Sequence, residues 1–300
     1  MVAMASTFTA VDLSRLPAPN VIEQIDFETL LSAALANLRA LDSTFDALVE
    51  SDPAYKVLQV CIYRETLLRQ NFNERLRGMM LAYAQQAQLD HLGALMGVSR
   101  LVLDPGDPTN GIDPTMESDA DLRHRIQLAP EGFSVAGPEG AYIYHALSAD
   151  AGVLDASATS PTPGEVVVTV LARAGDGTAS EALLASVDEA LASDDVRPMT
   201  DRVLVQSAQI VPYTVEAALH TYAGPDSALV LATAKERLST YVSESHRLGR
   251  DVALSGIMAA LHAEGVQRVV LSSPAADIVV DRTQAAYCTD ILVTYGGVDE

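Results

Sequence analysis

Aromatic residues and cysteines are scarce in this sequence. It has no tryptophan, and aromatic residues make up 5% of its 300 residues, so stacking platforms for bases or sugars are few. The two cysteines, Cys61 and Cys288, lie far apart and form no Cys-x-x-Cys motif. We therefore expect free thiols, either buried or kept in a reducing compartment, and no disulfide framework.

Positive charge is also scarce. Nineteen Lys and Arg residues stand against forty Asp and Glu residues, which gives a formal net charge of −21. Because affinity for nucleic acids depends on neutralising phosphates, we expect no direct nucleic-acid partner and no binding to anionic membranes. The densest basic group is spread around a predicted helix among glutamates, which indicates a solvated or interface-forming helix; it consists of Arg64, Arg69, Arg75 and Arg77.

Long apolar runs are missing as well. No run approaches the roughly 20 residues of a membrane span, and the opening MVAMASTFTAVDL has no basic n-region of a signal peptide. We therefore expect a chain made in the cytosol. Hydrophobic residues make up 49% of the sequence and charged residues 20%, which predicts an ordered globular protein of two or three domains.

One stretch, PEGFSVAGPEG, raises the question of a hydrolase. It places Ser134 between Gly132 and Gly137, and His145 follows. A nucleophile elbow, G-x-S-x-G, needs a strand before the serine and a helix directly after it. Here Ala136 occupies the place of the second glycine, and a predicted helix precedes the serine. We expect a turn or cap hydroxyl at this position; the alternative function is a serine hydrolase acting through Ser134 on the bacterial envelope.

The other motifs of enzyme chemistry are not found. The turn AGDGTAS lacks the Gly-Lys-Ser/Thr of a P-loop, and we expect Thr178 or Ser180 to cap the next helix. The six histidines are scattered without the spacing of a zinc site. We therefore expect no enzymatic activity, no catalytic residue, no cofactor and no metal site.

The first hundred residues predict helices. Leucines recur at helical spacing between residues 31 and 41, Pro53 suits the first turn of a second helix, and Gly97 is a candidate C-cap. No proline interrupts the second pattern up to about Leu89, which predicts a helix on the order of 50 Å long. Its apolar stripe needs other long helices, from this chain or from partners. We expect a bundle whose contacts are Val57, Cys61, Leu68, Phe72, Leu76, Met80 and Tyr83.

The rest of the sequence predicts an α+β fold. LDPGDPTNGIDPT reads as a linker, and short helices are expected at 119–129, begun by a Ser118 cap, and at 138–149. Beyond them we expect strands near 165–174, 203–205, 211–219 and 266–271, and helices near 180–193, 226–245 and 255–263. This order is close to a split βαβ sandwich, with helices on one face of a mainly antiparallel sheet. The tail TDILVTYGG adds an edge strand or pairs with another subunit.

Seven stretches, taken together and in order, resemble the baseplate J family, the wedge protein of contractile phage tails and of phage-tail-like bacteriocins. The resemblance covers roughly residues 15 to 296. The family pattern has a glycine before the Leu-Asp pair of AQQAQLDHLG, and its absence leaves open whether residues 85–88 continue the long helix. The stretches are ESDPAYKVLQVCIYRETLLRQNFNERLRGMMLAYA, LDHLGALMGVSR, ESDADLRHRI, FSVAGPEGAYIYHAL, TPGEVVVTVLARAGDG, VRPMTDRVLV and GVQRVVLSSPAADIVV.

The resemblance implies a mechanical role without enzymatic activity. Two copies in different conformations would bundle their N-terminal helices with one copy of baseplate protein I. The C-terminal part would link neighbouring wedges into a ring around the central hub and spike, and a sheath-initiator-type protein would dock on the bundle. The ring would relay the trigger for sheath contraction in the tail baseplate of a virion or tailocin particle assembled in the host bacterial cytoplasm.

We divide the chain into a helical bundle-forming region (1–103), a linker and short-helix connecting region (104–160) and an α/β ring-forming domain (161–300). Two conformations of one sequence require a joint. The hinge candidates are Gly132, Ser134 and Gly137 and, in the earlier linker, Gly106 and Gly111. A cytosolic binding module with an acidic surface is a further alternative.

Overall fold

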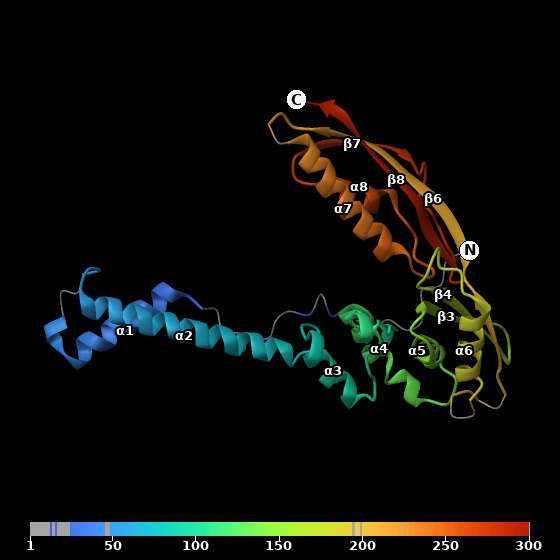
Figure 1. Cartoon of the computed structure of the whole chain (residues 1–300), viewed down its shortest axis with the longest axis horizontal. Coiled ribbons are helices and arrows are strands. Elements are labelled where there is room, and N and C mark those ends of the chain that lie inside the picture. The colour runs from blue at the N-terminus through green and yellow to red at the C-terminus, as the bar shows by residue number, and fades with distance from the viewer. Residues whose placement is uncertain are drawn as a thin grey trace. The chain divides into compact units, whose positions relative to one another are not determined.

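The computed structural model describes residues 13, 16, 25–45, 49–193, 196–198, 200–224 and 226–299. Most of the opening segment, on which the signal-peptide expectation rests, lies outside these residues. The chain divides into a helical unit that ends at Ser99 and an α/β unit that begins at Arg100. Figure 1 shows the elements of each unit.

The helical unit contains α1 (Phe27–Leu41), a 3₁₀ turn (Ser43–Phe45), α2 (Pro53–Gly78) and α3 (Gln86–Leu95). The Asp26 carboxylate begins α1 by accepting from the Glu28 and Thr29 amides. At the start of α2, Asp52 accepts from the Ala54 amide at 2.8 Å, with Pro53 in the first turn as expected. The helix α1 packs along α2.

The prediction of one continuous helix from Pro53 to about Leu89 is wrong. The helix α2 ends at Gly78, so its 26 residues span about 39 Å. The chain then turns before α3 begins at Gln86, and Ala84 and Leu89 are buried. The side-chain amide of Gln88 lies against Gly78 at this turn. The predicted cap after α3 is confirmed, because Gly97 has φ 72°.

The first half of the α/β unit is a three-stranded sheet with helices. A small hairpin of β1 (Val102–Asp104) and β2 (Thr115–Met116), with a 3₁₀ turn at Pro108–Asn110, leads into α4 (Asp119–Leu128), a 3₁₀ turn at Glu131–Phe133, and α5 (Glu139–Ala149). The sheet has the order β3-β4-β5; β3 and β4 are antiparallel, and β4 and β5 are parallel. Its strands are β3 (Val153–Thr162), β4 (Glu165–Ala172) and β5 (Arg202–Ser207), with α6 (Glu181–Leu191) between the last two.

The second half has the same two kinds of strand pair in a different order of elements. It contains β6 (Gln209–Thr221), α7 (Ser227–Ser245), α8 (Leu254–Leu261), β7 (Val266–Ser273) and β8 (Gln284–Val298). The order is β7-β6-β8, with β6 antiparallel to β7 and parallel to β8. The helices cover one face of this curved sheet (Figure 1), where Leu219, Leu238 and Ile257 are fully buried.

The α+β class is confirmed, but the expected single, mainly antiparallel sheet is wrong. Two three-stranded sheets are present, and each contains one antiparallel and one parallel pair. The sequence analysis missed β3, whose segment VLDASATSPT mixes small and polar residues and lacks a run of β-branched ones. The remaining predicted helices and strands are found, and the tail forms the edge strand β8.

Candidate functional site

The helix α2 buries one side and exposes apolar residues on the other. Ile62 is buried on the side that faces its own unit, together with Leu31 of α1. Val57, Leu68 and Phe72 are 64%, 72% and 60% exposed. At about 100° per residue these three side chains fall within an arc of about 60°, and Ile62 lies about 110° from the middle of that arc. We call this exposed side the outer face of α2.

Four predicted bundle contacts lie on the outer face or beside it, and three do not. Cys61 is exposed there with Val57, Leu68 and Phe72. Leu76 is half-buried, and Met80 and Tyr83 follow the end of α2. The Tyr83 hydroxyl donates to the Leu16 carbonyl within the same unit. Exposed apolar residues on α2 or at its C-terminal end that the sequence analysis did not list are Val60, Tyr63, Leu67 and Met79.

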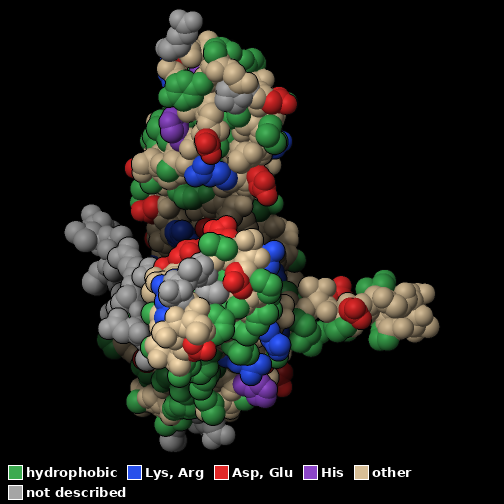
Figure 2. Space-filling view, turned by 90° about the vertical axis from the view of Figure 1, so that its left-hand side faces the viewer, with side chains coloured by type: hydrophobic (Ala, Val, Ile, Leu, Met, Phe, Trp, Pro, Cys, Tyr) green, Lys and Arg blue, Asp and Glu red, His purple; other side chains and the backbone are tan. Residues whose placement is uncertain are grey.

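Charges are interspersed along α2. Arg69 forms an (i, i+4) ion pair with Glu65 at 2.6 Å, so this member of the basic group pairs within its own helix. Figure 2 likewise shows hydrophobic, acidic and basic side chains intermingled on the face that it presents. The outer face of α2 exposes large apolar side chains with charged side chains between them. Such a surface is more typical of a protein–protein interface than of a surface that stays in water.

Side chains of the α/β unit lie close to Gly132 and Gly137, although Phe133 and Val135 between them are exposed. A Cβ at Gly132 would lie 2.2 Å from the Tyr144 ring, and one at Gly137, where φ is 75°, would lie 2.8 Å from Pro198 Cγ. In the earlier linker, Gly106 has φ 67° and Gly111 has φ 73°. A Cβ at Gly106 would lie 2.4 Å from the Ile112 carbonyl oxygen, whereas the space at Gly111 is open. The four glycines therefore differ in how closely other atoms approach them.

Ser134 has the contacts of a turn residue. Its Oγ accepts from the Ala136 amide at 3.3 Å. The His145 ring contacts the Gly132 carbonyl oxygen at 3.3 Å and lies edge-on to Tyr144, and burial lowers its pKa. At the other motif tested, Ser180 accepts from the Leu183 amide and caps α6.

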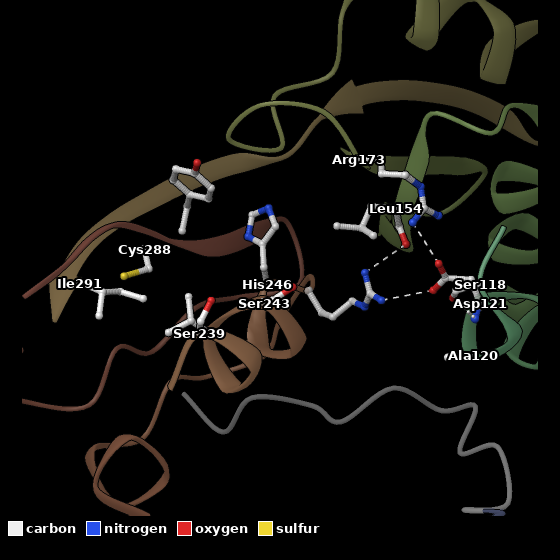
Figure 3. Close-up of a pocket in the computed structure, with 13 residues that line it drawn as sticks. Ser118, Ala120, Asp121, Leu154, Arg173, Ser239, Ser243, His246, Cys288 and Ile291 are labelled. Carbon is white, nitrogen blue, oxygen red and sulfur yellow. Dashed lines mark hydrogen bonds and ion pairs between the residues drawn. The ribbon is translucent and has the colours of Figure 1, made fainter. Parts of the chain in front are cut away.

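A polar joint connects the two sheets of the α/β unit. Asp121 of α4 binds Arg173, which follows β4, at 2.9 Å and Arg247, which follows α7, at 3.4 Å (Figure 3). Asp155 of β3 accepts from the Leu248 amide at 2.9 Å, and burial raises the pKa of its carboxyl. One carboxylate thus holds guanidinium groups from both sheets, and a second binds the backbone beside one of them.

A cleft of about 620 Å³ adjoins this joint. Asp121 and Arg173 lie at one end and Ile291 at the other (Figure 3), and Val242 and Arg247 also line the cleft. Among the described residues, no group of three or more His, Cys, Asp or Glu side chains could hold a metal ion. No helix in the same part of the chain is both long enough and apolar enough to span a membrane.

A buried ion pair anchors the start of the α/β unit. Glu117 and Arg125 are 2% and 6% exposed and lie 2.6 Å apart. Glu117 Oε2 also accepts from the Leu101 amide at 3.1 Å, and Arg100 binds the Glu117 carbonyl oxygen and Asp119. The first residues of the unit are therefore fixed to α4. The sequence analysis missed this pair and the joint, because their members come from segments far apart in the chain and no short motif marks them.

The α2 face is apolar and exposed, and the α/β unit is held together by internal ion pairs; both features are typical of a structural protein that assembles with partners. Three family profiles match the chain: the Baseplate J-like N-terminal domain over residues 50–107, the Baseplate J-like central domain over residues 134–207 and the Baseplate J-like protein C-terminal domain over residues 213–294. The chain therefore belongs to the baseplate J family.

A curated relative agrees with this assignment. The chain is 49% identical to Baseplate protein J of Escherichia phage P2 over 300 residues, which covers 97% of this chain and 99% of that protein. A chain of the solved baseplate of the anti-feeding prophage is also similar in structure, with 13% sequence identity and a TM-score of 0.40. The match covers 59% of this chain and 43% of that chain, and we draw no argument from it. The role is structural, without enzymatic activity, and its place is the virion tail baseplate.

Proposed function

We propose that this chain is a wedge component whose N-terminal helices bundle with a second copy of itself and with baseplate protein I. The observation that carries the proposal is the exposed apolar outer face of α2, centred on Val57, Leu68 and Phe72. The N-terminal family profile begins at residue 50 and includes all of α2. Covering such a face with partner helices removes apolar area from water, which is the main favourable term in association.

The α/β unit then links wedges into a ring around the central hub and spike, and the bundle offers a docking place for a sheath-initiator-type protein. In this proposal the regions 1–103, 104–160 and 161–300 form the bundle, the connection and the ring. The net charge of −21 supports protein partners and argues against DNA as a direct one. When a trigger widens the ring, the wedges relay it and sheath contraction begins.

The two copies differ in conformation at a glycine-containing joint. Gly111 has a left-handed backbone and open space around it, although two hydrogen bonds between Asp107 and Ile112 close its turn. Gly132 and Gly137 lie close to the Tyr144 and Pro198 side chains. On this ground we place the difference between the copies in the 103–112 segment and not in the 130–140 segment.

Co-expression with the wedge partner tests the bundle. The double variant Leu68→Asp and Phe72→Asp places two carboxylates on the outer face, where both side chains are exposed, so the isolated chain should remain folded. We expect loss of the stoichiometric complex in a tag pull-down, because burying uncompensated charges is costly. The matched control is Leu41→Asp, which changes an exposed leucine at the end of α1. A double variant that assembles as well as the control would overturn the proposal.

A further inference from the structure

The arginines of α2 lie on different sides of the helix. Arg64 and Arg75 are exposed and lie about 20° apart around the helix axis, on the side of Val57, so both belong to the outer face. Arg69 lies about 90° from the middle of this face, and the exposed Arg77 lies about 170° from it. The basic group that the sequence analysis singled out is therefore divided, and two of its four members share a face with exposed apolar residues.

The two outer-face arginines have no carboxylate partner in the described part of the chain. Both acidic residues of α2 are engaged elsewhere: Glu65 lies 2.6 Å from Arg69, and the Glu74 carboxylate accepts from a glutamine side chain one turn earlier at 3.2 Å. Arg75 also suits the negative end of the helix dipole, but Arg64 lies near the middle of α2, where that effect has faded. The helix dipole therefore explains only one of the two charges.

The charge of α2 is opposite to that of the chain as a whole. The helix carries five basic and two acidic side chains, a net charge of +3, whereas the chain has a formal net charge of −21. An acidic partner is repelled by most of this chain but attracted to α2. The outer face thus combines large apolar side chains with the positive charge that directs such a partner to it.

We propose that the outer face of α2 is covered by a helix of a different protein, whose apolar stripe carries carboxylates that bind Arg64 and Arg75. This inference rests on the proposed bundle and names the chemistry of the helix that covers α2 in it. Apolar contacts with Leu68 and Phe72 supply most of the affinity, and the ion pairs fix the register and exclude wrong partners. In the bundle, each α2 then faces the wedge partner and not the α2 of the second copy.

Like charge disfavours the α2 helix of a second copy at this face. A parallel pair in register would place Arg64 beside Arg64 and Arg75 beside Arg75, and an antiparallel pair would still gather four guanidinium groups in one interface. The carboxylates of α2 do not neutralise them, because Glu65 is paired with Arg69 and Glu74 lies about 130° from the middle of the outer face. Nucleic acid is disfavoured as well, since large apolar side chains lie between the two guanidinium groups along the helix axis.

The spacing of the arginines sets the spacing of the partner's carboxylates. Arg64 and Arg75 are 11 residues apart, which is about three turns and about 16 Å along the axis. A helix packed along α2 therefore needs two acidic residues about 11 positions apart, with apolar residues between them opposite Leu68 and Phe72. The absence of this pattern from every helix of the wedge partner would contradict the inference.

Two neighbouring arginines give a matched test in the full chain. Arg75→Glu and Arg77→Glu change the same charge in the last turn of α2, where both side chains are exposed, but on opposite sides. In a titration with the wedge partner, Arg75→Glu should weaken the complex at least about tenfold and Arg77→Glu less than about twofold. Arg64→Glu should weaken it as Arg75→Glu does. Equal effects of Arg75→Glu and Arg77→Glu would overturn the inference.

Replacement by glutamine separates charge from shape. The double variant Arg64→Gln with Arg75→Gln should bind the wedge partner more weakly than the wild-type chain at low salt and should lose most of the salt dependence of binding. Unchanged binding at low salt would overturn the inference. If Leu68→Asp with Phe72→Asp still abolished the complex in that case, the bundle itself would stand, so the failures of the two proposals can be told apart.

A mixing experiment tests the second copy as the occupant. If α2 faced α2, a copy carrying Arg64→Glu with Arg75→Glu would place opposite charges against a wild-type copy. Sedimentation velocity of the equimolar mixture should show no more association than the wild-type chain alone. Stronger association of the mixture would assign the outer face to a second copy and overturn the inference. Binding of a DNA duplex by the wild-type chain that this double variant lacks would overturn it in favour of nucleic acid.

Discussion

The helical unit and the α/β unit differ in how much apolar core each of them buries. Among the described residues, the helical unit buries only Leu31, Ile62, Ala84, Leu89 and Val98 as apolar core, whereas each sheet of the α/β unit has a large core of its own. The helical unit also exposes a row of large apolar side chains on α2. We therefore expect the α/β unit to be stable by its own packing and, in the proposed bundle, the helical unit to gain much of its stability from the partner that covers it.

The largest expected effect tests the internal ion pair of the α/β unit. Glu117→Ala removes the carboxylate that lies 2.6 Å from the buried Arg125 guanidinium and balances its charge, and we expect a loss of about 3–5 kcal/mol in the free energy of unfolding by urea. In the helical unit, Glu65→Ala breaks the exposed pair with Arg69 and should cost less than about 0.5 kcal/mol. Replacing both members of the buried pair, as Glu117→Leu with Arg125→Met, should recover part of the loss. A double variant as unstable as Glu117→Ala would show that desolvation is not the cause.

A pair of leucines compares the two units directly. Leu238 of α7 is fully buried, so Leu238→Ala should cost about 2–5 kcal/mol of stability. Leu68→Ala on the outer face of α2 should change the stability of the isolated chain by less than about 0.5 kcal/mol. The same Leu68 variant should weaken the complex with the wedge partner by more than about 1 kcal/mol. Circular dichroism melts measure the stability of each variant, and a binding titration measures its affinity for the wedge partner. If Leu68→Ala and Leu238→Ala lowered stability equally, the two units would not differ in the way proposed.

Two glycines separate a fixed turn from a free one. Gly137→Ala meets both a left-handed backbone and the Pro198 ring, so we expect a loss of about 1–3 kcal/mol. Gly111→Ala meets only the backbone preference, because the space around it is open, and should cost about 1 kcal/mol. Chemical denaturation of the two variants side by side gives the comparison. If Gly137→Ala were the milder change, the 130–138 segment would be the better candidate for the joint.

The smallest expected effect is the change in stability at acidic pH that the His124 side chain causes. Burial lowers the pKa of His124 in α4, although the nearby Asp155 carboxylate opposes the shift. Because the folded pKa lies below the unfolded value of about 6.5, the stability from neutral His124 is complete above that value and is lost as pH falls toward the folded pKa. Replacing it in His124→Gln should flatten the decline in stability on acidification from neutral pH. His91→Gln in the helical unit is the control, and an equal change in both variants would contradict the assignment.

The contribution of Asp155 to stability changes with pH in the opposite direction to that of His124. Burial raises the pKa of its carboxyl, so the folded state keeps this proton longer than the unfolded state does. Its contribution to stability therefore falls as pH rises from the unfolded value of about 3.9 to the raised folded pKa. This opposing slope is the reason to measure the His124 effect as a difference between variants at each pH.

The sequence predicted the elements better than their partners. Alternation along 211–219 and the caps at Ser118 and Ser180 are local signals, and β6, α4 and α6 confirm them. The helix α2 ends at Gly78, although helical spacing of apolar residues continues beyond it in the sequence, so periodicity alone could not place this end. The division into two sheets depends on pairing between strands distant in the chain, so the order of elements alone could not show it.

The candidate site was predictable in part for the same reason. Apolar spacing along α2 identified a helix with too much apolar surface, and Val57, Leu68 and Phe72 are indeed exposed. Periodicity could not separate the outer face from the side packed within the unit, so Leu76 was grouped with residues that differ from it in burial. Asp121, Arg173 and Arg247 meet only after both sheets have folded.

The passage between the two sheets has a mechanical consequence. The strand β5 ends at Ser207 and β6 begins at Gln209, so a single residue, Ala208, carries the chain from one sheet to the next. It is buried with Leu171 and Ala285. A pull on β6 therefore reaches β5 without any slack in the chain, and the apolar cluster around Ala208 and the polar joint both resist a twist. In the proposed ring, the α/β unit should therefore transmit tension from one sheet to the other with little stretching.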